Sequence, residues 1–289
     1  MQLHTTCITC GSTVIHPLRG YYESKGLVEC KGCGLVFMER IPTAAELETH
    51  YGVYTYDTED TLSSLTIDSY NTLLDEMEPY RNVNRILDVG CGRGYFLEEA
   101  RKRGWEVYGT EFSQTAVDLL QRKGINAFHG PIGTTAFEGL SFDVVTSFEV
   151  IEHINTPNED LMAIHQKLRS GGLLYITTPN FNSLMRHVLK SDYNVIAFPE
   201  HLSYYTRKTL NKTVCRHGFK NIKFLSTGIS ITRIQHSLAG GGQGTDSDEK
   251  LRKLTSSNAL MGFVKRVVNK SLTALNMGIA LKGYYVKEA

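Results

Sequence analysis

Four cysteines near the N-terminus are the first residues whose types and spacing indicate a chemistry. Cys7 and Cys10 form one Cys-x2-Cys pair, and Cys30 and Cys33 form a second pair nineteen residues later. A glycine follows each pair directly and tolerates the positive φ angle of a tight turn. This spacing is typical of four thiolates around one tetrahedral zinc ion. The alternative is four unrelated buried cysteines. We expect a zinc-stabilised head over residues 1–40, which is too short to fold on an apolar core alone.

A glycine-rich segment, LDVGCGRG at residues 87–94, follows a short apolar run and opens a helical pattern. Glycines in such a loop let the backbone approach a ligand closely. The spacing is G-x-G-x-G, whereas dinucleotide enzymes have G-x-G-x-x-G. Asp88 stands two residues before the first glycine, where a carboxylate repels pyrophosphate and attracts a cation. The charges therefore favour S-adenosylmethionine (SAM), which carries a sulfonium and an ammonium group, over NAD.

Glu111 ends the next strand-like run, nineteen residues after Gly92. A carboxylate at this place can accept two hydrogen bonds from vicinal ribose hydroxyls. An exposed acid at a strand end is the alternative, but the glycine loop at this separation favours ribose binding. The residues expected to contact the cofactor are Asp88, Gly90, Cys91, Gly92, Gly94, Glu111, Phe112, Phe148 and Glu149.

Acids and an imidazole recur in the segment Glu149-x-x-Glu152-His153. If this segment is helical, positions i, i+3 and i+4 share one face and can hold a divalent cation that polarises a hydroxyl group. A metal-free loop with a structurally hydrogen-bonded His153 is the alternative. His201 could enter the same pocket and, with His153, orient or deprotonate an acceptor, or it could simply begin a helix. The candidate divalent site comprises Glu149, Glu152, His153 and His201.

The elements that must position these residues alternate between short apolar runs and amphipathic helical patterns. Such alternation predicts βαβ units and a parallel sheet with helices on both faces. We expect strands at 84–90, 105–111, 125–130, 142–150, 173–179, 219–227 and 280–286, and helices at 94–104, 113–124, 158–172 and 206–217.

The same patterns divide the chain into segments. We expect the zinc-binding head at 1–40, a helical, tyrosine-rich connector covering the active-site end at 41–82, the ligand-binding core at 83–235, a flexible excursion at 236–258 and a terminal helix and strand at 259–289. Residues 259–278 are amphipathic. They could lie on a membrane surface or pack on their own domain.

Composition excludes several classes of protein. The 289 residues are 41% hydrophobic and 21% charged, which is ordinary for a globular chain with a full core. The formal net charge of +1 argues against a nucleic-acid partner. No apolar run approaches the about 18 residues of a membrane span. The N-terminal sequence does not resemble a signal peptide, so we expect a cytoplasmic protein. The sequence leaves the oligomeric state open.

From about residue 84 to residue 219, the sequence resembles the class I SAM-dependent methyltransferases. LDVGCGRG looks like the first motif of that family, Glu111 like its ribose-binding acid, and FDVVTSFEVIEHI like its fourth-strand motif. The resemblance implies an α/β fold, with a Rossmann-like, doubly wound, mostly parallel seven-stranded sheet. One departure concerns the run from His129 to Ile132, which lacks the acid that contacts the adenine amine in many members. Backbone and apolar groups must then contact the adenine.

Two subgroups of that family share further motifs with this chain. Glu149-x-x-Glu152-His153 resembles the metal-binding motif of ubiquinone-pathway O-methyltransferases and of small-RNA 2′-O-methyltransferases; in the RNA enzymes a further downstream histidine resembles His201 in HLSYYTR. The cysteine head and the PEHLSYYT pattern resemble zinc-ribbon methyltransferases of sugar and polysaccharide biosynthesis. This second resemblance implies O-methylation of a sugar or glycan precursor.

The expected cofactors are SAM, a structural Zn²⁺ and, as a further candidate, Mg²⁺ or another divalent cation. Three alternatives stay open: a quinone or phenolic O-methyltransferase with a divalent metal, an RNA 2′-O-methyltransferase, and a non-catalytic SAM-binding module.

Overall fold

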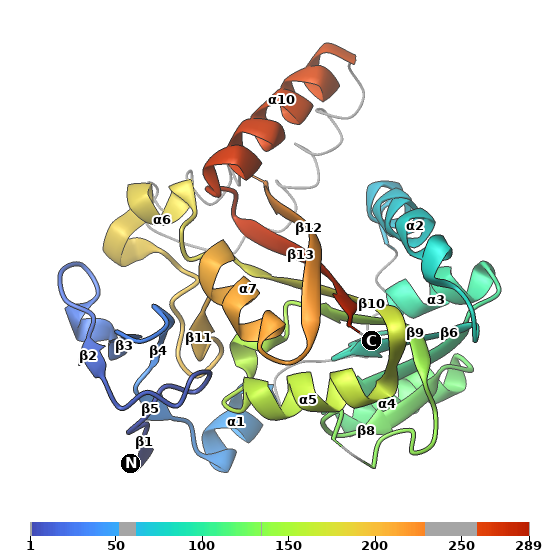
Figure 1. Ribbon diagram of the computed structural model, residues 1–289, viewed down its shortest axis with the longest axis horizontal. Coiled ribbons are helices and arrows are strands. Elements are labelled where there is room, and N and C mark those ends of the chain that lie inside the picture. The colour runs from blue at the N-terminus through green and yellow to red at the C-terminus, as the bar shows by residue number, and fades with distance from the viewer. Residues whose placement is uncertain (1, 52–61, 134, 229–258, 289) are drawn as a thin grey trace.

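A seven-stranded sheet forms the centre of the computed structural model, which describes residues 2–51, 62–133, 135–228 and 259–288 (Figure 1). Its strand order is β12-β13-β10-β9-β6-β7-β8. Within the described residues, β13 alone runs antiparallel to its neighbours. The expected mostly parallel seven-stranded sheet is therefore confirmed. The strands are β6 (Arg85–Val89), β7 (Glu106–Glu111), β8 (Asn126–His129), β9 (Phe142–Phe148), β10 (Leu168–Pro179), β12 (Phe219–Thr227) and β13 (Ala280–Lys287).

Helices cover both faces of this sheet because its strands are apolar on both sides. Consecutive strand residues point to opposite faces, and Ile86 and Leu87 accordingly belong to two different core clusters. On the Ile86 face lie α2 (Ser64–Met77), α3 (Tyr95–Lys102) and α4 (Gln114–Arg122); on the Leu87 face lie α5 (Pro157–Lys167) and α7 (Arg207–Cys215). This is the doubly wound arrangement that the alternating pattern predicts.

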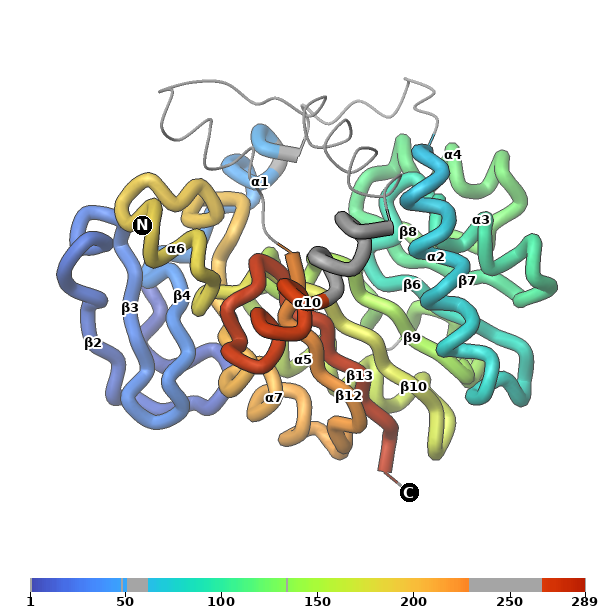
Figure 2. The backbone as a smooth tube through the Cα atoms, turned by 90° about the horizontal axis from the view of Figure 1, so that it is seen from above, coloured from blue at the N-terminus to red at the C-terminus, as the bar shows by residue number. Residues whose placement is uncertain are grey.

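The cysteine head contains a small antiparallel sheet of β2 (Ile15–Pro17), β3 (Leu27–Cys30) and β4 (Val36–Met38). A fourth strand, β11 (Ser203–Tyr204), comes from far along the chain and pairs with β4. A separate pair joins β1 (Gln2–Leu3) to β5 (Arg40–Ile41). Figure 2 shows the head at one end of the molecule, with α6 (Leu184–Leu189) beside it. The head and the core are thus joined through a shared sheet.

One expected helix boundary is wrong. We expected a helix over 158–172 closed by two glycines, but α5 ends at Lys167 and β10 begins at Leu168. Leu168 pairs with Phe142 of β9, and the register shifts before Leu173. Gly171, with a φ of 71°, lies within that irregular stretch. The glycines therefore shape a bulge in the strand, and tertiary pairing with β9 decides where the helix ends.

Several elements lie where the sequence indicated only connectors. These are α1 (Ala44–Tyr51), α6, and the one-turn helices η1 (Glu23–Lys25), η2 (Glu78–Tyr80) and η4 (Lys190–Asp192). A further one-turn helix, η3 (Ile151–His153), lies within the segment that was considered as helical. The last helix, α10 (Ala259–Leu275), packs on β12, where Asn269 and Thr273 bond to the backbone of that strand and of the residue after it. Across the described ranges, no helix is long and apolar enough to cross a membrane. The excursion expected at 236–258 lies outside the described residues.

Candidate active site

Three glycines give the loop after β6 its shape, each for a different reason. A Cβ atom on Gly90 would lie 2.6 Å from a methyl group of Val150, and one on Gly94 would lie 2.4 Å from Leu120. These two positions therefore allow close packing of the loop against its neighbours. Gly92 has a φ of 51° and open space where its Cβ would be. Its backbone is the part of the loop that a ligand can approach.

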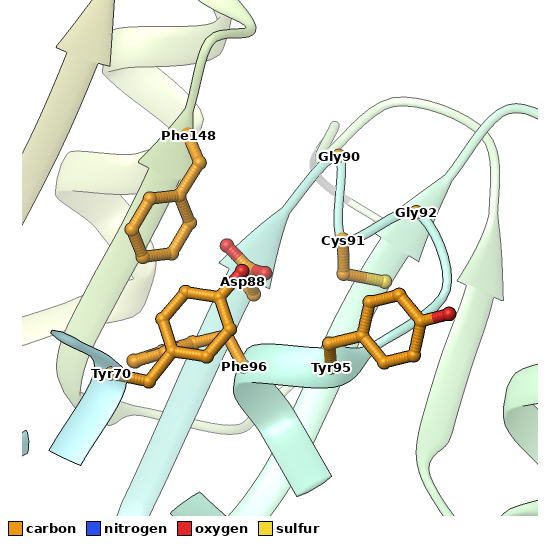
Figure 3. A pocket seen from close by; sticks show the side chains of 8 residues that line it. All are labelled: Tyr70, Asp88, Gly90, Cys91, Gly92, Tyr95, Phe96 and Phe148. Carbon is orange, nitrogen blue, oxygen red and sulfur yellow. The ribbon is translucent and has the colours of Figure 1, made fainter. Parts of the chain in front are cut away.

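A cavity of about 160 Å³ opens beside this loop (Figure 3). Its lining consists of Tyr70, Asp88, Gly90, Cys91, Gly92, Tyr95, Phe96 and Phe148. Five of these are among the expected cofactor contacts, whereas Gly94, Glu111, Phe112 and Glu149 lie outside the lining. The volume is below the about 300–1,000 Å³ typical of ligand pockets. By itself the cavity is therefore too small to enclose a whole ligand of that size.

Three aromatic rings form one wall of the cavity. Phe96 and Phe148 have ring centroids 5.0 Å apart, and Tyr70 lies 5.5 Å from Phe96 and 6.2 Å from Phe148. Figure 3 shows Tyr70 of α2 and Phe148 of β9 near the Asp88 carboxylate. Tyr70, Tyr95 and Phe96 were not among the cofactor contacts predicted from the sequence. Tyr95 and Phe96 follow Gly94 directly, so their place beside the loop was a usable signal. Tyr70 is brought in by the packing of α2.

Asp88 is a buried acid at the centre of this pocket. It accepts a hydrogen bond of 2.7 Å from the Thr146 hydroxyl. Burial raises the pKa of Asp88 to about 7. The Thr146 hydrogen bond lowers this pKa, and the negative charge of Glu111 raises it. A buried acid without a cationic partner is costly to ionise. The site is therefore suited to a ligand that brings a positive charge.

Glu111 supports the glycine loop from the end of β7. Its carboxylate accepts hydrogen bonds from the backbone N–H groups of Gly92 (2.9 Å), Phe112 (2.8 Å) and Ser113 (3.1 Å). Phe112 is 70% exposed, and its carbonyl oxygen lies 2.8 Å from Nε2 of His129. Glu111 and Phe112 therefore form the rim that a ligand extending from the cavity would meet.

A second group of side chains lies just beyond the end of β9, whose last residue, Phe148, lines the cavity. Glu152, His153 and His201 each offer one ligand atom, and these atoms all lie within 4.8 Å of one another. The two imidazole rings meet edge to face, with centroids 4.8 Å apart. Thr178 donates a 2.9 Å hydrogen bond to Oε2 of Glu152. The fold thus brings His201 to Glu152 and His153, as the sequence analysis expected.

Backbone carbonyls set the tautomers of both histidines. Nδ1 of His153 lies 2.6 Å from the Glu200 carbonyl oxygen, and Nδ1 of His201 lies 2.6 Å from that of Val195. A carbonyl only accepts, so Nδ1 carries the proton and Nε2 is the basic nitrogen of each neutral ring. Burial lowers the pKa of His153 to about 4, and the neighbouring His201 lowers it further. His153 is therefore neutral at pH 7, the form that binds metals.

The expected helical face of Glu149, Glu152 and His153 is not formed. Glu149 has a φ of 53° and precedes the one-turn helix, and its N–H bonds to the Thr177 carbonyl of β10 at 3.1 Å. Pairing with β10 turns the chain before any helix begins. Glu149 consequently lies outside the group of ligand atoms. Burial raises the pKa of Glu152 well above its usual range, and the charge of Glu149 adds to that shift.

Comparison with known proteins identifies the fold around this site. The family model described as "Methyltransferase domain" matches residues 63–223, more than half of the chain. The chain belongs to this family. The expectation of a class I SAM-dependent methyltransferase domain is therefore confirmed. A SAM-dependent methyltransferase from Archaeoglobus fulgidus supports the fold, with a TM-score of 0.52, 22% identity and coverage of 76% of this chain and 94% of that one.

Similar curated proteins are named ubiquinone biosynthesis O-methyltransferase. The one from Roseobacter denitrificans is 35% identical over 111 residues, covering 36% of this chain and 44% of the relative. The one from Saccharophagus degradans is 30% identical over 182 residues, covering 53% and 76%. The chain spans about half the length of the first curated relatives it matches.

The four cysteines of the head form one compact cluster. The sulfur atoms of Cys7 and Cys33 are 3.6 Å apart, and those of Cys10 and Cys30 are 3.4 Å apart. All four lie within 4.8 Å of one another. Sulfurs on a tetrahedral zinc, each about 2.3 Å from the ion, are separated by about 3.8 Å. The cluster therefore fits a zinc ion, and these separations are too long for disulfide bonds.

We expect Glu111→Ala to weaken SAM binding at least about tenfold, because both the ribose acceptors and three loop contacts are lost. Glu106→Ala is the matched control, since Glu106 lies at the other end of β7 and pairs with Arg85. Calorimetric titration of the purified variants with SAM tests this. Equal affinities for the two variants would exclude Glu111 from the binding site.

We expect SAM affinity to fall as the pH falls below 7. In the free protein Asp88, with a pKa of about 7, takes up a proton in this range. The cationic ligand favours the ionised acid, so binding must release that proton, and affinity should fall about fivefold between pH 7 and pH 6. Titrations from pH 6 to 8 measure this slope, which Asp88→Asn should flatten. A wild-type affinity independent of pH would refute the pairing.

Proposed function

We propose that this protein is a SAM-dependent O-methyltransferase that activates the hydroxyl group of a small molecule with a divalent cation. The observation that carries the proposal is the convergence of Glu152, His153 and His201 just after the strand that lines the cavity. One acid and two imidazoles are a common donor set for first-row divalent metals. The proposal therefore assigns cofactor binding to the cavity and hydroxyl activation to this group.

On the cofactor side, the charges and the shape of the pocket support SAM. Asp88 would pair with the ammonium group, Gly92 would permit close backbone approach, and Glu111 would accept hydrogen bonds from the ribose hydroxyls. The exposed ring of Phe112 is available to pack against the adenine, which compensates for the absence of an acid after β8. Gly90 and Gly94 serve this site indirectly by letting the loop pack closely on the core.

On the acceptor side, methyl transfer requires an oxygen aligned with the methyl carbon and the removal of its proton. Glu152, through its second carboxylate oxygen, and the Nε2 atoms of His153 and His201 would hold a divalent cation. Such a cation lowers the pKa of a hydroxyl group that it binds. In a metal-free alternative, His201 Nε2 would take the proton directly. Glu149 would contribute only its charge.

A phenolic acceptor is supported by the names of the curated relatives, which concern ubiquinone biosynthesis. A sugar or glycan precursor is the second candidate. It rests on the resemblance of the cysteine head to zinc-ribbon methyltransferases of sugar biosynthesis. The head lies outside residues 63–223 matched by the family model, yet its sheet includes β11, which begins two residues after His201. The acceptor side therefore contains a part that the shared methyltransferase domain lacks.

Incubation with methyl-labelled SAM separates these possibilities. The purified protein is given catechol-type phenols or nucleotide sugars, each with and without EDTA. Label on the phenol that disappears with EDTA and returns with Mn²⁺, while the four cysteines keep their zinc throughout, is the expected result. Label on the sugar would replace the phenolic acceptor, and transfer unaffected by EDTA would favour His201 as the direct base. SAM binding without transfer to either acceptor or to any extract component would indicate a non-catalytic module.

A further inference from the structure

The cysteine head is connected to the proposed acceptor site through the backbone of one residue, Leu202. The N–H of Met38, in β4 of the head, donates to the Leu202 carbonyl at 2.8 Å, and the Leu202 N–H donates to the Glu152 carbonyl at 2.7 Å. His201 is the neighbour of Leu202 in the chain. One short backbone path therefore leads from the head to both an acid and an imidazole of the site.

The strand pairing that follows Leu202 strengthens this connection. Ser203 lies opposite Phe37 and Tyr204 opposite Val36, so β11 forms the edge strand of the head's sheet. The Ser203 hydroxyl also donates to the carbonyl of Ile151, the residue before Glu152, at 3.3 Å. β11 therefore pairs with the head through β4 and is hydrogen-bonded to the one-turn helix η3 through Ser203.

Tyr205 lies between the cysteine cluster and the acid. Its side chain is fully buried in the same apolar cluster as Cys7, Cys33 and Ile151. Burial raises the pKa of the Tyr205 phenol, and nearby Glu152, Cys7 and Cys33 raise it further. Tyr205 is therefore close both to the cysteines and to Glu152, and all of these side chains are buried.

A second attachment holds the first cysteine pair. The Asn158 amide of α5 donates to the carbonyls of Ile8 and Thr9, both at 3.2 Å, and its own oxygen lies 3.0 Å from Nε2 of His217. Ile8 and Thr9 lie between Cys7 and Cys10. Each cysteine pair is therefore tied to the methyltransferase core at a different place, so the head cannot move as an independent module without breaking buried contacts.

We infer that the cysteine head positions the acceptor site: metal bound by Cys7, Cys10, Cys30 and Cys33 holds β4 in place, and β4 holds His201 and Glu152 through β11 and Leu202. This inference rests on the proposed zinc and on the proposed acceptor site. Strands of three or four residues are too short to keep their geometry without the metal that closes the head. A head that only recruits a partner would leave these side chains unaffected.

The glycine loop after β6 has no described bond to the cysteine head, so SAM binding can serve as a reference for effects limited to the acceptor site. Its bonds run between the β6 loop, Glu111 and the start of α4, in the half of the sheet formed by β6, β7 and β8. None of the bonds described for the loop reaches the cysteine head. Loss of the zinc should therefore disturb the two histidines while leaving SAM binding intact.

The test compares Cys10→Ala with Cys10→His in the full-length protein. Cys10 is half-buried, and histidine can replace a thiolate as a zinc ligand. Zinc content, SAM affinity by calorimetry and the imidazole ¹⁵N signals of His153 and His201 are measured for each. We expect Cys10→His to keep zinc and wild-type imidazole signals. Cys10→Ala should lose zinc and shift or broaden both signals, with SAM affinity changed less than threefold.

As a second measurement that needs no variant, wild-type protein without a divalent cation at the acceptor site is compared before and after a chelator removes the zinc. Imidazole signals unchanged in the zinc-free protein would overturn the inference. A parallel loss of SAM binding would overturn it too, because the metal would then support the whole fold rather than the acceptor site. Methyl transfer that resists EDTA would refute the proposed divalent cation, but it would not alter the imidazole result.

Discussion

Glu152→Gln is expected to lower kcat at least about 100-fold while SAM affinity stays within about threefold of wild type. Glutamine keeps an oxygen that can accept the Thr178 hydrogen bond, so the local fold should persist. It cannot ionise when a cation binds, and it places an NH₂ or a neutral oxygen toward the imidazoles. Oε1 of Glu152 lies 3.9 Å from Nε2 of His153. Among the described residues, Glu152 is the only acid in this group of ligand atoms.

Glu159→Gln is the matched control for this experiment. Glu159 lies in the first turn of α5 and is exposed, so the kcat of the Glu159→Gln variant should equal that of wild type. Steady-state kinetics, SAM calorimetry and Mn²⁺ binding are measured on both variants. A Glu152→Gln enzyme within threefold of wild-type kcat would remove this acid from the mechanism. Loss of SAM binding would show instead that Glu152 supports the cofactor pocket.

Asp143→Ala should lower the free energy of unfolding by about 3–5 kcal/mol. The fully buried Asp143 carboxylate accepts hydrogen bonds from the N–H groups of Asn82 (2.9 Å), Val83 (3.1 Å) and Asn84 (2.7 Å), and it pairs with Arg169. These bonds hold the turn that leads into β6. Alanine leaves the three donors and the guanidinium without this acceptor. Because β6 carries Asp88 and the glycine loop, the cofactor site depends on this turn.

Asp75→Ala provides the comparison for the stability measurement. Asp75 pairs with Arg103 but is 67% exposed, so the loss should be about 0–1 kcal/mol. Urea unfolding followed by circular dichroism measures both variants. A loss below 1 kcal/mol for Asp143→Ala would mean that water replaces the carboxylate at this turn, and that the buried pair contributes little to the stability of the core.

The amino-acid sequence alone was sufficient for the features that depend on local pattern. Alternating apolar runs and amphipathic helices predict the doubly wound sheet, because residues buried on both faces of a parallel sheet must be apolar throughout. The glycine spacing with Asp88 indicates a cationic ligand, because charge repulsion acts whatever the surrounding fold. The two Cys-x2-Cys pairs predict a metal cluster, since each pair presents two thiolates from one turn and the second pair follows only nineteen residues later.

Tertiary structure decided the features that join distant segments. The bulge before Leu173 replaces a helix end because β9 supplies hydrogen-bond partners to Leu168. Glu149 lies outside the group of ligand atoms because β10 holds its N–H group before the one-turn helix begins. Tyr70 reaches the cavity only through the packing of α2. Leu202 connects the cysteine head to the acid because two strands about 165 residues apart in sequence pair in space. Sequence spacing contains no information on such long-range pairing, which depends on which buried surfaces and backbone groups satisfy one another once the chain is compact.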